Sequence, residues 1–242
     1  QRLLYSADHP LGLAVALDSG DELQDALQED HLTAQTLAAQ LESVARSNVT
    51  SIAFVDSDVP DVEELTTRLQ EQGITVHSVH AEKDGIEQVS EILSGYSGLD
   101  SVMIFSHAAN EGFSLGSSSV DTVTLGAVED QLAEWGQALS KDADLLLYGC
   151  SLADDDSARL FLSRIAELTQ ADVAASEDTT GHADRGGDWD LEWQHGEVNT
   201  DALDDALLQD WQGSLLSVVV TTELDVLDAP DLSSLTALQD DL

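Results

Sequence analysis

Short apolar runs and amphipathic segments alternate along most of this chain. From Thr50 onward, runs of apolar and β-branched residues are separated by segments whose apolar positions recur at helical spacing. The expected strands are 51–55, 75–79, 102–106, 145–148 and 173–176, with a small hairpin around 113–120. The expected helices are 62–72, 85–93, 122–139 and 157–169. This order is typical of βαβ crossovers, so we predict an α/β fold with a mostly parallel sheet flanked by helices.

The two ends of the chain have other patterns. Leucines near helical spacing and early acidic residues favour one or two helices within 21–46. The segment 186–193 alternates like a solvent-facing strand, which would place Trp189 and Trp193 on one face. A short helix at 204–211 is expected to dock on the sheet through three side chains, namely Leu207, Leu208 and Trp211.

The charge of the chain and the length of its apolar runs each exclude one class of partner. It has 48 Asp and Glu against 8 Lys and Arg, a formal net charge of −40. Binding to nucleic acid depends on clusters of Lys and Arg, so we expect no nucleic-acid partner. The apolar runs are far shorter than the roughly 18–20 residues of a membrane span, so we expect no membrane insertion. Hydrophobic residues make up 42% of the chain, which is enough for a core.

Composition also bears on where the protein works. An acidic, lysine-poor surface stays hydrated in high salt, which favours a marine, halophilic or extracellular setting, with an acidic cytosolic protein as the alternative. The single cysteine forms no internal disulfide, so the chain is not a disulfide-stapled scaffold. The chain begins at Gln1 without a Met or a basic leader, and we expect it to be a segment of a longer polypeptide.

Two expected strands end in reactive side chains. The strand 102–106 runs directly into His107, and the strand 145–148 runs through Gly149 into Cys150. If these strands are parallel neighbours, both side chains emerge at the carboxyl edge of the sheet, where ligands of open α/β sheets bind. There an imidazole can deprotonate a thiol, and the thiolate can attack a carbonyl carbon. Each residue taken singly has a plainer interpretation, a buried small hydrophobe for the cysteine and a satisfied polar group for the histidine.

Several short motifs resemble those of one family. The motifs are FVDS at 54–57, DGIEQ at 84–88, YSGLD at 96–100, FSH at 105–107, LYGC at 147–150, ADVAAS at 171–176 and GGDWDLE at 186–192. Together they resemble the domain of unknown function DUF4347, over about 50–198. The apolar block before His107 and the second block before Gly149 and Cys150 also resemble the caspase, gingipain and legumain clan of cysteine peptidases. DUF4347 domains occur near the start of very large bacterial surface or secreted proteins, ahead of repeat arrays.

The resemblance implies a caspase-like three-layer sandwich with a His–Cys dyad. His107 would be the general base and Cys150 the nucleophile of peptide-bond hydrolysis, with a peptide or a segment of the chain itself as substrate. The backbone N–H groups of Ala108 and Cys150 would stabilise the oxyanion, although relatives usually have glycine after the histidine. A Cβ there is costly only if φ is positive. In the clan, the loop with Ser176, Glu177 and Asp178 shapes the substrate pocket, and its acidity would favour a basic side chain.

The flanks fit the same family. The segment 2–8 resembles a short piece that precedes this domain in such proteins, and 219–226 resembles the opening of a β-helix repeat. We therefore divide the chain into a lead-in with a helix (1–49), a caspase-like domain (50–213) and a linker that begins a β-rich repeat module (214–242). Further repeat domains of the same polypeptide are the expected partners.

A non-catalytic interpretation remains open. The domain can be a structural or adhesive module of a surface protein that keeps the fold without turnover. We expect no resident cofactor; calcium is the one cation considered, because Asp56, Asp58 and Asp61 follow a strand end and hard cations favour clustered carboxylates. No EF-hand loop pattern is present, and solvated acidic loops are the favoured interpretation of these residues.

Overall fold

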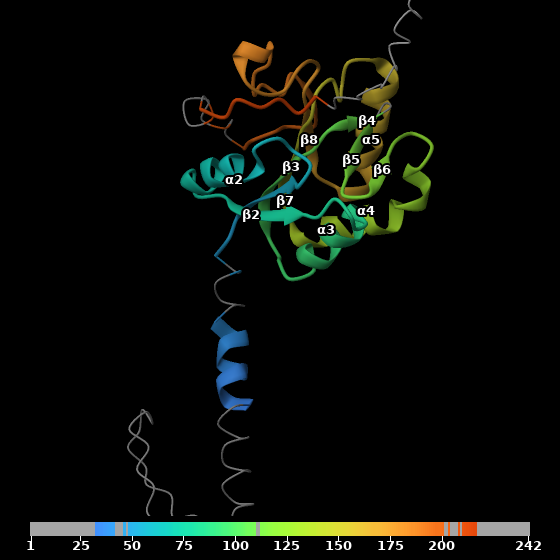
Figure 1. The fold of residues 1–242 in the computed structure, drawn as a ribbon. Helices are drawn as coiled ribbons and strands as arrows, with labels where there is room; N and C mark the ends of the chain where they lie inside the picture. The colour runs from blue at the N-terminus through green and yellow to red at the C-terminus, as the bar shows by residue number, and fades with distance from the viewer. Residues whose placement is uncertain are drawn as a thin grey trace, which may run out of the picture.

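The sheet at the centre of the protein has six strands, in the order β2-β1-β3-β7-β8-β9 (Figure 1). The computed structural model describes residues 32–41, 46, 48–109, 112–200, 203, 208 and 210–216. The strands are β1 (Ser51–Asp56), β2 (Thr75–Val79), β3 (Leu99–Phe105), β7 (Leu139–Tyr148), β8 (Asp172–Ala175) and β9 (Trp193–His195). The first five run parallel and β9 is antiparallel to β8, which confirms the predicted mostly parallel sheet.

The helices follow the predicted pattern with one clear exception. They are α2 (Val62–Glu71), α3 (Gly85–Leu93), α4 (Glu129–Trp135) and α5 (Asp156–Thr169). The side chains of Asp84 and Asp155 cap α3 and α5 by accepting from the N–H groups three residues on. The predicted helix 122–139 is wrong in its extent, because two 3₁₀ turns flank the shorter α4. At Gly136 the chain approaches the carbonyl of Thr169 so closely that a Cβ would lie 2.3 Å from its oxygen.

The sheet packs on both faces, which makes three layers. Side chains alternate along each strand, so Ile104 faces one apolar cluster and Phe105 the other. The first cluster includes the apolar side chains of α3, α4 and α5. The second includes those of α2 together with Trp211 and Leu215 from the end of the described chain. Figure 1 shows α2 on one side of the sheet and α3 and α4 on the other.

The predicted strand at 186–193 is wrong, because only β9 is extended there. Trp189 is 6% exposed and belongs to the second cluster, where its ring lies beside those of Phe105, Tyr148 and Trp211. Trp193 instead packs against the first cluster. The two tryptophans therefore lie on opposite faces of the sheet, because the chain between them crosses the edge instead of continuing as one strand.

The segments outside this sheet are small. The predicted hairpin is confirmed as part of a three-stranded antiparallel sheet of β4 (Ala108–Ala109), β5 (Gly112–Leu115) and β6 (Ser118–Val120). Residues 32–41 are helical with exposed side chains, within the helical segment predicted before the domain. The helix predicted at 204–211 falls mostly outside the described residues, but Leu208 and Trp211 are fully buried. Within the part of the chain described, no helix has the length and apolarity to cross a membrane.

A half-buried histidine makes the stability of this fold depend on pH. His77 on β2 stacks against Phe54, and its Nε2 lies 2.8 Å from the Tyr96 hydroxyl. Burial, and secondarily the charge of Arg46, lowers the pKa of His77 from its ordinary 6.5. The unfolded chain therefore binds more protons below that pH, so this contribution to stability is present above about pH 6.5 and is lost as the pH falls.

We expect the free energy of unfolding of the wild type to fall between pH 7.5 and 5.5 relative to that of His77→Phe. Chemical denaturation of both proteins at the two pH values measures this difference, and the contributions of the many carboxylates cancel between them. An identical pH dependence in the two proteins would contradict the assigned role of His77.

Candidate active site

The two strands that end in His107 and Cys150 are parallel neighbours. On β3 and β7, Phe105 is in register with Tyr148, and the N–H of Ser106 continues the pairing by donating to the Tyr148 carbonyl at 3.1 Å. His107 and Cys150 therefore leave the sheet at the same carboxyl edge. The sequence argument depended on this adjacency, and the sheet order provides it.

The chain turns sharply around Cys150. A Cβ on Gly149 would lie 3.0 Å from the Ser106 carbonyl oxygen and from the Leu152 side chain, so this position has little room for a larger residue. Ser151 has a left-handed backbone with φ of 54°, which is uncommon for a residue with a side chain. Its N–H donates to the carbonyl of Asp178. The turn places the thiol beside the loop that follows β8.

The Cys150 thiol is buried and faces a backbone carbonyl. Its Sγ donates to the carbonyl oxygen of Thr180 at 3.6 Å, and the residue is 1% exposed. Burial is the main cause that raises the pKa of the Cys150 thiol, and the negative charge of Asp178 adds to it. Asp155, which precedes α5, directs its carboxylate to that helix and caps it by accepting from the Ala158 N–H at 2.8 Å.

His107 lies between two backbone carbonyls. Its Nδ1 is 2.8 Å from the carbonyl oxygen of Leu215, and its Nε2 is 3.2 Å from that of Asp58. A carbonyl oxygen only accepts hydrogen bonds, so both contacts are hydrogen bonds only when both ring nitrogens carry a proton. A neutral ring keeps one of the two bonds. A proton on Nδ1 retains the shorter bond to Leu215, whereas a proton on Nε2 retains the bond to Asp58 and leaves Nδ1 as an acceptor. Asp58 thereby orients the imidazole with Nδ1 toward Leu215.

The turn that carries the Asp58 carbonyl is fixed by Asp56, the last residue of β1. The carboxylate of Asp56 accepts from the N–H of Asp58 at 3.0 Å and from that of Gly116 at 2.6 Å. It is only 3% exposed, so the expectation of a solvated loop is wrong for this residue. Burial raises its pKa, while these bonds and the nearby His107 act in the opposite direction. A sequence signal for this positioning role was available, because Asp56 stands at the carboxyl end of an expected strand.

The segment 211–215 lies across this edge of the sheet, against His107 and the loop that holds the Cys150 thiol. The Gly213 carbonyl accepts from the His182 N–H at 2.9 Å, and Ser214 forms an antiparallel bridge with Gly181. The N–H of Leu215 donates to Thr180 at 2.9 Å. The Thr180 carbonyl also accepts from the Cys150 thiol at 3.6 Å, so the Leu215 N–H and the thiol share one acceptor. The backbone of Leu215 thus meets His107 directly and Cys150 through the Thr180 carbonyl.

The sequence analysis missed this contact. The β-branched run after Gly213 suggested the start of a following module, yet Ser214 pairs with this domain and Leu215 is completely buried in it. We therefore place the end of the domain after Leu215. The available signal was the glycine at 181, with φ of 139°, where a Cβ would lie 2.6 Å from the Cα of Ser214. Only glycine allows the two segments to approach this closely.

Ala108 does not need the conformational freedom of glycine. Among the described residues, the non-glycine positions with positive φ are Asp61, Ser151 and Gln170, so Ala108 has an ordinary backbone. It opens β4 and pairs with Phe113. The alanine that distinguishes this chain from the expected pattern therefore introduces no backbone strain beside His107.

The loop after β8 holds the three residues expected to shape a substrate pocket. Ser176 is fully buried, and its hydroxyl exchanges hydrogen bonds with the backbone of Asp178. Glu177 forms an ion pair with Arg159 at 2.9 Å. Asp178 lies nearest to the dyad, since its carbonyl accepts from Ser151 and its charge acts on Cys150. Hence one of the two acidic side chains is already neutralised by a neighbour.

Three exposed carboxylates meet beside this loop. The oxygens of Asp178, Asp188 and Glu192 lie within 4.8 Å of one another. Partial desolvation raises the pKa of Asp178, and the charges of Asp188, Glu192 and Asp190 raise it further. In the part of the chain described, this is the group with metal-ligand geometry. The predicted group of Asp56, Asp58 and Asp61 does not have this geometry, because the Asp56 carboxylate is turned to backbone N–H groups. Calcium binding stays a prediction.

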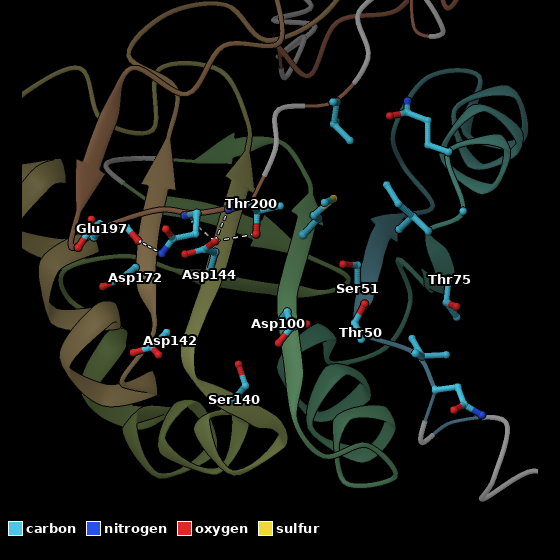
Figure 2. Close-up of a pocket in the computed structure, with 18 residues that line it drawn as sticks. Thr50, Ser51, Thr75, Asp100, Ser140, Asp142, Asp144, Asp172, Glu197 and Thr200 are labelled. Atoms are coloured by element: carbon cyan, nitrogen blue, oxygen red, sulfur yellow. Dashed lines mark hydrogen bonds between the residues drawn. The ribbon is translucent and has the colours of Figure 1, made fainter.

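A pocket lies at the opposite, amino-terminal edge of the sheet, away from His107 and Cys150 (Figure 2). This pocket of about 1170 Å³ has many acidic and hydroxyl side chains in its wall, but neither His107 nor Cys150. Asp144 is 1% exposed there, and one of its oxygens accepts from Asn199 and from both the N–H and the hydroxyl of Thr200. Asp144 therefore ties the chain after β9 to the sheet, which gives it a structural role.

A family model matches residues 52–215, about two thirds of the chain, and its description is domain of unknown function (DUF4347). The chain belongs to the DUF4347 family. The resemblance stated from the motifs is thus confirmed for the family, and the match ends at Leu215, the residue whose carbonyl lies beside His107. No curated protein sequence matches the chain.

Among solved structures, the DUF4347 domain is similar to a flavodoxin from Streptococcus pneumonia TIGR4. The match has 12% sequence identity and a TM-score of 0.27, and it covers 52% of this chain and 80% of the flavodoxin. Agreement at this level is too low to support an inference about function.

Proposed function

We propose that this DUF4347 domain is a caspase-like cysteine endopeptidase with His107 as the general base and Cys150 as the nucleophile. The single observation that carries the proposal is that both side chains, from adjacent parallel strands, lie at the backbone of Leu215. The His107 Nδ1 is 2.8 Å from the Leu215 carbonyl oxygen, and the Leu215 N–H shares the Thr180 carbonyl with the Cys150 thiol. A nucleophile and a base close to the same backbone carbonyl are what acyl transfer requires.

The chemistry follows from the hydrogen bonds of the imidazole. With Nε2–H held by the Asp58 carbonyl, Nδ1 is the nitrogen that accepts the thiol proton. The resulting thiolate attacks the carbonyl carbon, and the Nδ1–H of the imidazolium is then available to the leaving amine. Backbone N–H groups of Ala108 and Cys150 are the proposed donors to the oxyanion. Asp56 and Asp58 act as positioning residues, since they touch the base or its support and not the peptide.

The proposed setting is the surface or exterior of a bacterial cell, as a domain of a larger adhesin-like protein. The net charge of −40 supports a salt-rich or extracellular environment, because mutual repulsion of so many carboxylates is weakened by salt. The alternative proposal is a structural or adhesive module of such a protein without turnover. Under that alternative the contacts around Cys150 serve packing only, and neither side chain matters for any cleavage.

The role of the base is tested by His107→Ala. We expect the rate of Cys150-dependent peptide hydrolysis to fall by about 10²–10⁴-fold, because a positioned general base contributes that much. Hydrolysis of a mixture of short peptides, followed by mass spectrometry, measures the rate. His107→Gln is the informative companion, because its amide still donates to a carbonyl but does not take the thiol proton, so we expect the same loss.

The matched control is His195→Ala, which removes an exposed histidine on β9. It is expected to leave the rate unchanged. Full activity of the His107→Gln protein would contradict the assignment of His107 as the base.

A further inference from the structure

Residues 213–216 have the arrangement of a bound peptide in the proposed site. Ser214 pairs antiparallel with Gly181, and the flanking bonds from His182 to Gly213 and from Leu215 to Thr180 complete a short extended pairing. Extended peptides commonly bind along an exposed strand edge in this way, with main-chain bonds fixing the register. Here the register places the Leu215 carbonyl beside His107, and the Leu215 N–H on the same Thr180 carbonyl that accepts from Cys150.

The position of Leu215 is fixed from both sides. Before it, Trp211 is fully buried, donates from its indole N–H to the Pro60 carbonyl at 3.0 Å, and lies 5.3 Å from the Trp189 ring. Gly213 is also required, since a Cβ there would lie 2.2 Å from the Trp211 ring. After it, Leu216 is 53% exposed. The side chain before the peptide bond is thus enclosed, while the residue after the bond faces solvent.

We propose that the peptide bond between Leu215 and Leu216 is the natural substrate of the dyad, so that the protein cuts its own chain at the end of this domain. This inference rests on the proposed function of His107 and Cys150. An apolar residue before the cut differs from the basic residue suggested by the loop after β8. An apolar residue is favoured there because Leu215 lies in an apolar cluster, and a basic residue is not, because Glu177 is already paired with Arg159.

The reaction balances with water as the only co-reactant. The proton of the Cys150 thiol passes to Nδ1 of His107, and Sγ bonds to the Leu215 carbonyl carbon. When the C–N bond to Leu216 breaks, the Nδ1 proton goes to the nitrogen, which leaves as a free amine. Water then hydrolyses the thioester, which leaves a carboxylate on Leu215 and restores the thiol. Nδ1 already lies 2.8 Å from the Leu215 oxygen, next to the nitrogen that must be protonated.

The test uses the 242-residue chain as wild type, Cys150→Ala, Leu216→Pro and Leu216→Ala. Proline at 216 changes an exposed residue and replaces the scissile N–H amide by a tertiary one, while alanine keeps the amide. Intact mass measured over time is expected to show release of the peptide 216–242 from the wild type and from Leu216→Ala. Cys150→Ala and Leu216→Pro are expected to remain whole. Equal melting temperatures of the two 216 variants exclude a difference in folding.

A parallel assay separates this inference from the proposed function. Acetyl-Gly-Ser-Leu-aminomethylcoumarin, which copies residues 213–215, is added to the wild type and to Cys150→Ala. Cys150-dependent release of the dye with the 215–216 bond intact would overturn the inference and leave the dyad standing. Release of 216–242 from Leu216→Pro, or Cys150-dependent cutting at another bond only, would also overturn it. Absence of both activities in the wild type would overturn the inference and the proposed function together.

Discussion

Cys150→Ala is expected to abolish peptide hydrolysis, with a loss of about 10⁴-fold or more in rate, because removal of a covalent nucleophile leaves only the residual effect of binding. Cys150 is 1% exposed, and alanine removes one sulfur atom from the apolar cluster that contains it. The fold should therefore survive with a modest loss of stability. The measurement is the rate of peptide cleavage by mass spectrometry, with the melting temperature of each protein as a check of folding.

Cys150→Ser is the matched control for this prediction. A hydroxyl has nearly the size of the thiol and can donate to the Thr180 carbonyl, but it is a far weaker nucleophile at neutral pH. We expect Cys150→Ser to be as inactive as Cys150→Ala. Unchanged cleavage in both variants would contradict the peptidase and favour the structural or adhesive module, for which no function depends on this side chain.

The same proteins test the calcium prediction if calcium is added. Binding to the folded state alone would raise the melting temperature with calcium concentration, and the rise would be equal in the wild type and in Cys150→Ala. The acidic group near the dyad, Asp178, Asp188 and Glu192, has the geometry for such an effect. A melting temperature that does not respond to calcium would remove this cation from consideration.

Trp211→Ala is expected to lower the free energy of unfolding by about 3–5 kcal/mol, the range for truncating a buried large aromatic side chain. Trp211 is completely buried, and its ring packs beside Trp189 while its N–H is bonded to Pro60. The loss is a large share of the stability of an ordinary domain. Urea denaturation followed by circular dichroism measures it, since the remaining tryptophans would complicate a fluorescence signal.

Trp211→Phe provides the comparison. Phenylalanine keeps most of the apolar contact and loses the hydrogen bond to Pro60, so the expected cost is smaller, about 1–2 kcal/mol. A cost below about 1 kcal/mol for Trp211→Ala would show that the segment 211–215 is not part of the folded domain. That result would also remove the basis for placing Leu215 at the site of His107 and Cys150.

The local pattern of the sequence determined the layers of this protein. Buried parallel strands have to be apolar on both faces, so 51–55 and 145–148 were recognisable as strands, and the helix at Gly85–Leu93 was predicted with its observed limits. The same reasoning placed His107 and Cys150 at strand ends. The same reasoning underestimated the length of β7, because the first part of that strand is polar and partly exposed.

Only the tertiary structure decided what meets at the carboxyl edge. The pairing of β3 with β7, the approach of the Asp58 carbonyl to His107, and the return of Leu215 to lie beside His107 are contacts between segments far apart in the chain. Sequence periodicity reports on which face of an element is buried, and it contains no information about which distant backbone group that face will meet. The catalytic candidates were therefore predictable as residue types at strand ends, whereas the Leu215 backbone that meets them became visible only when the chain was folded.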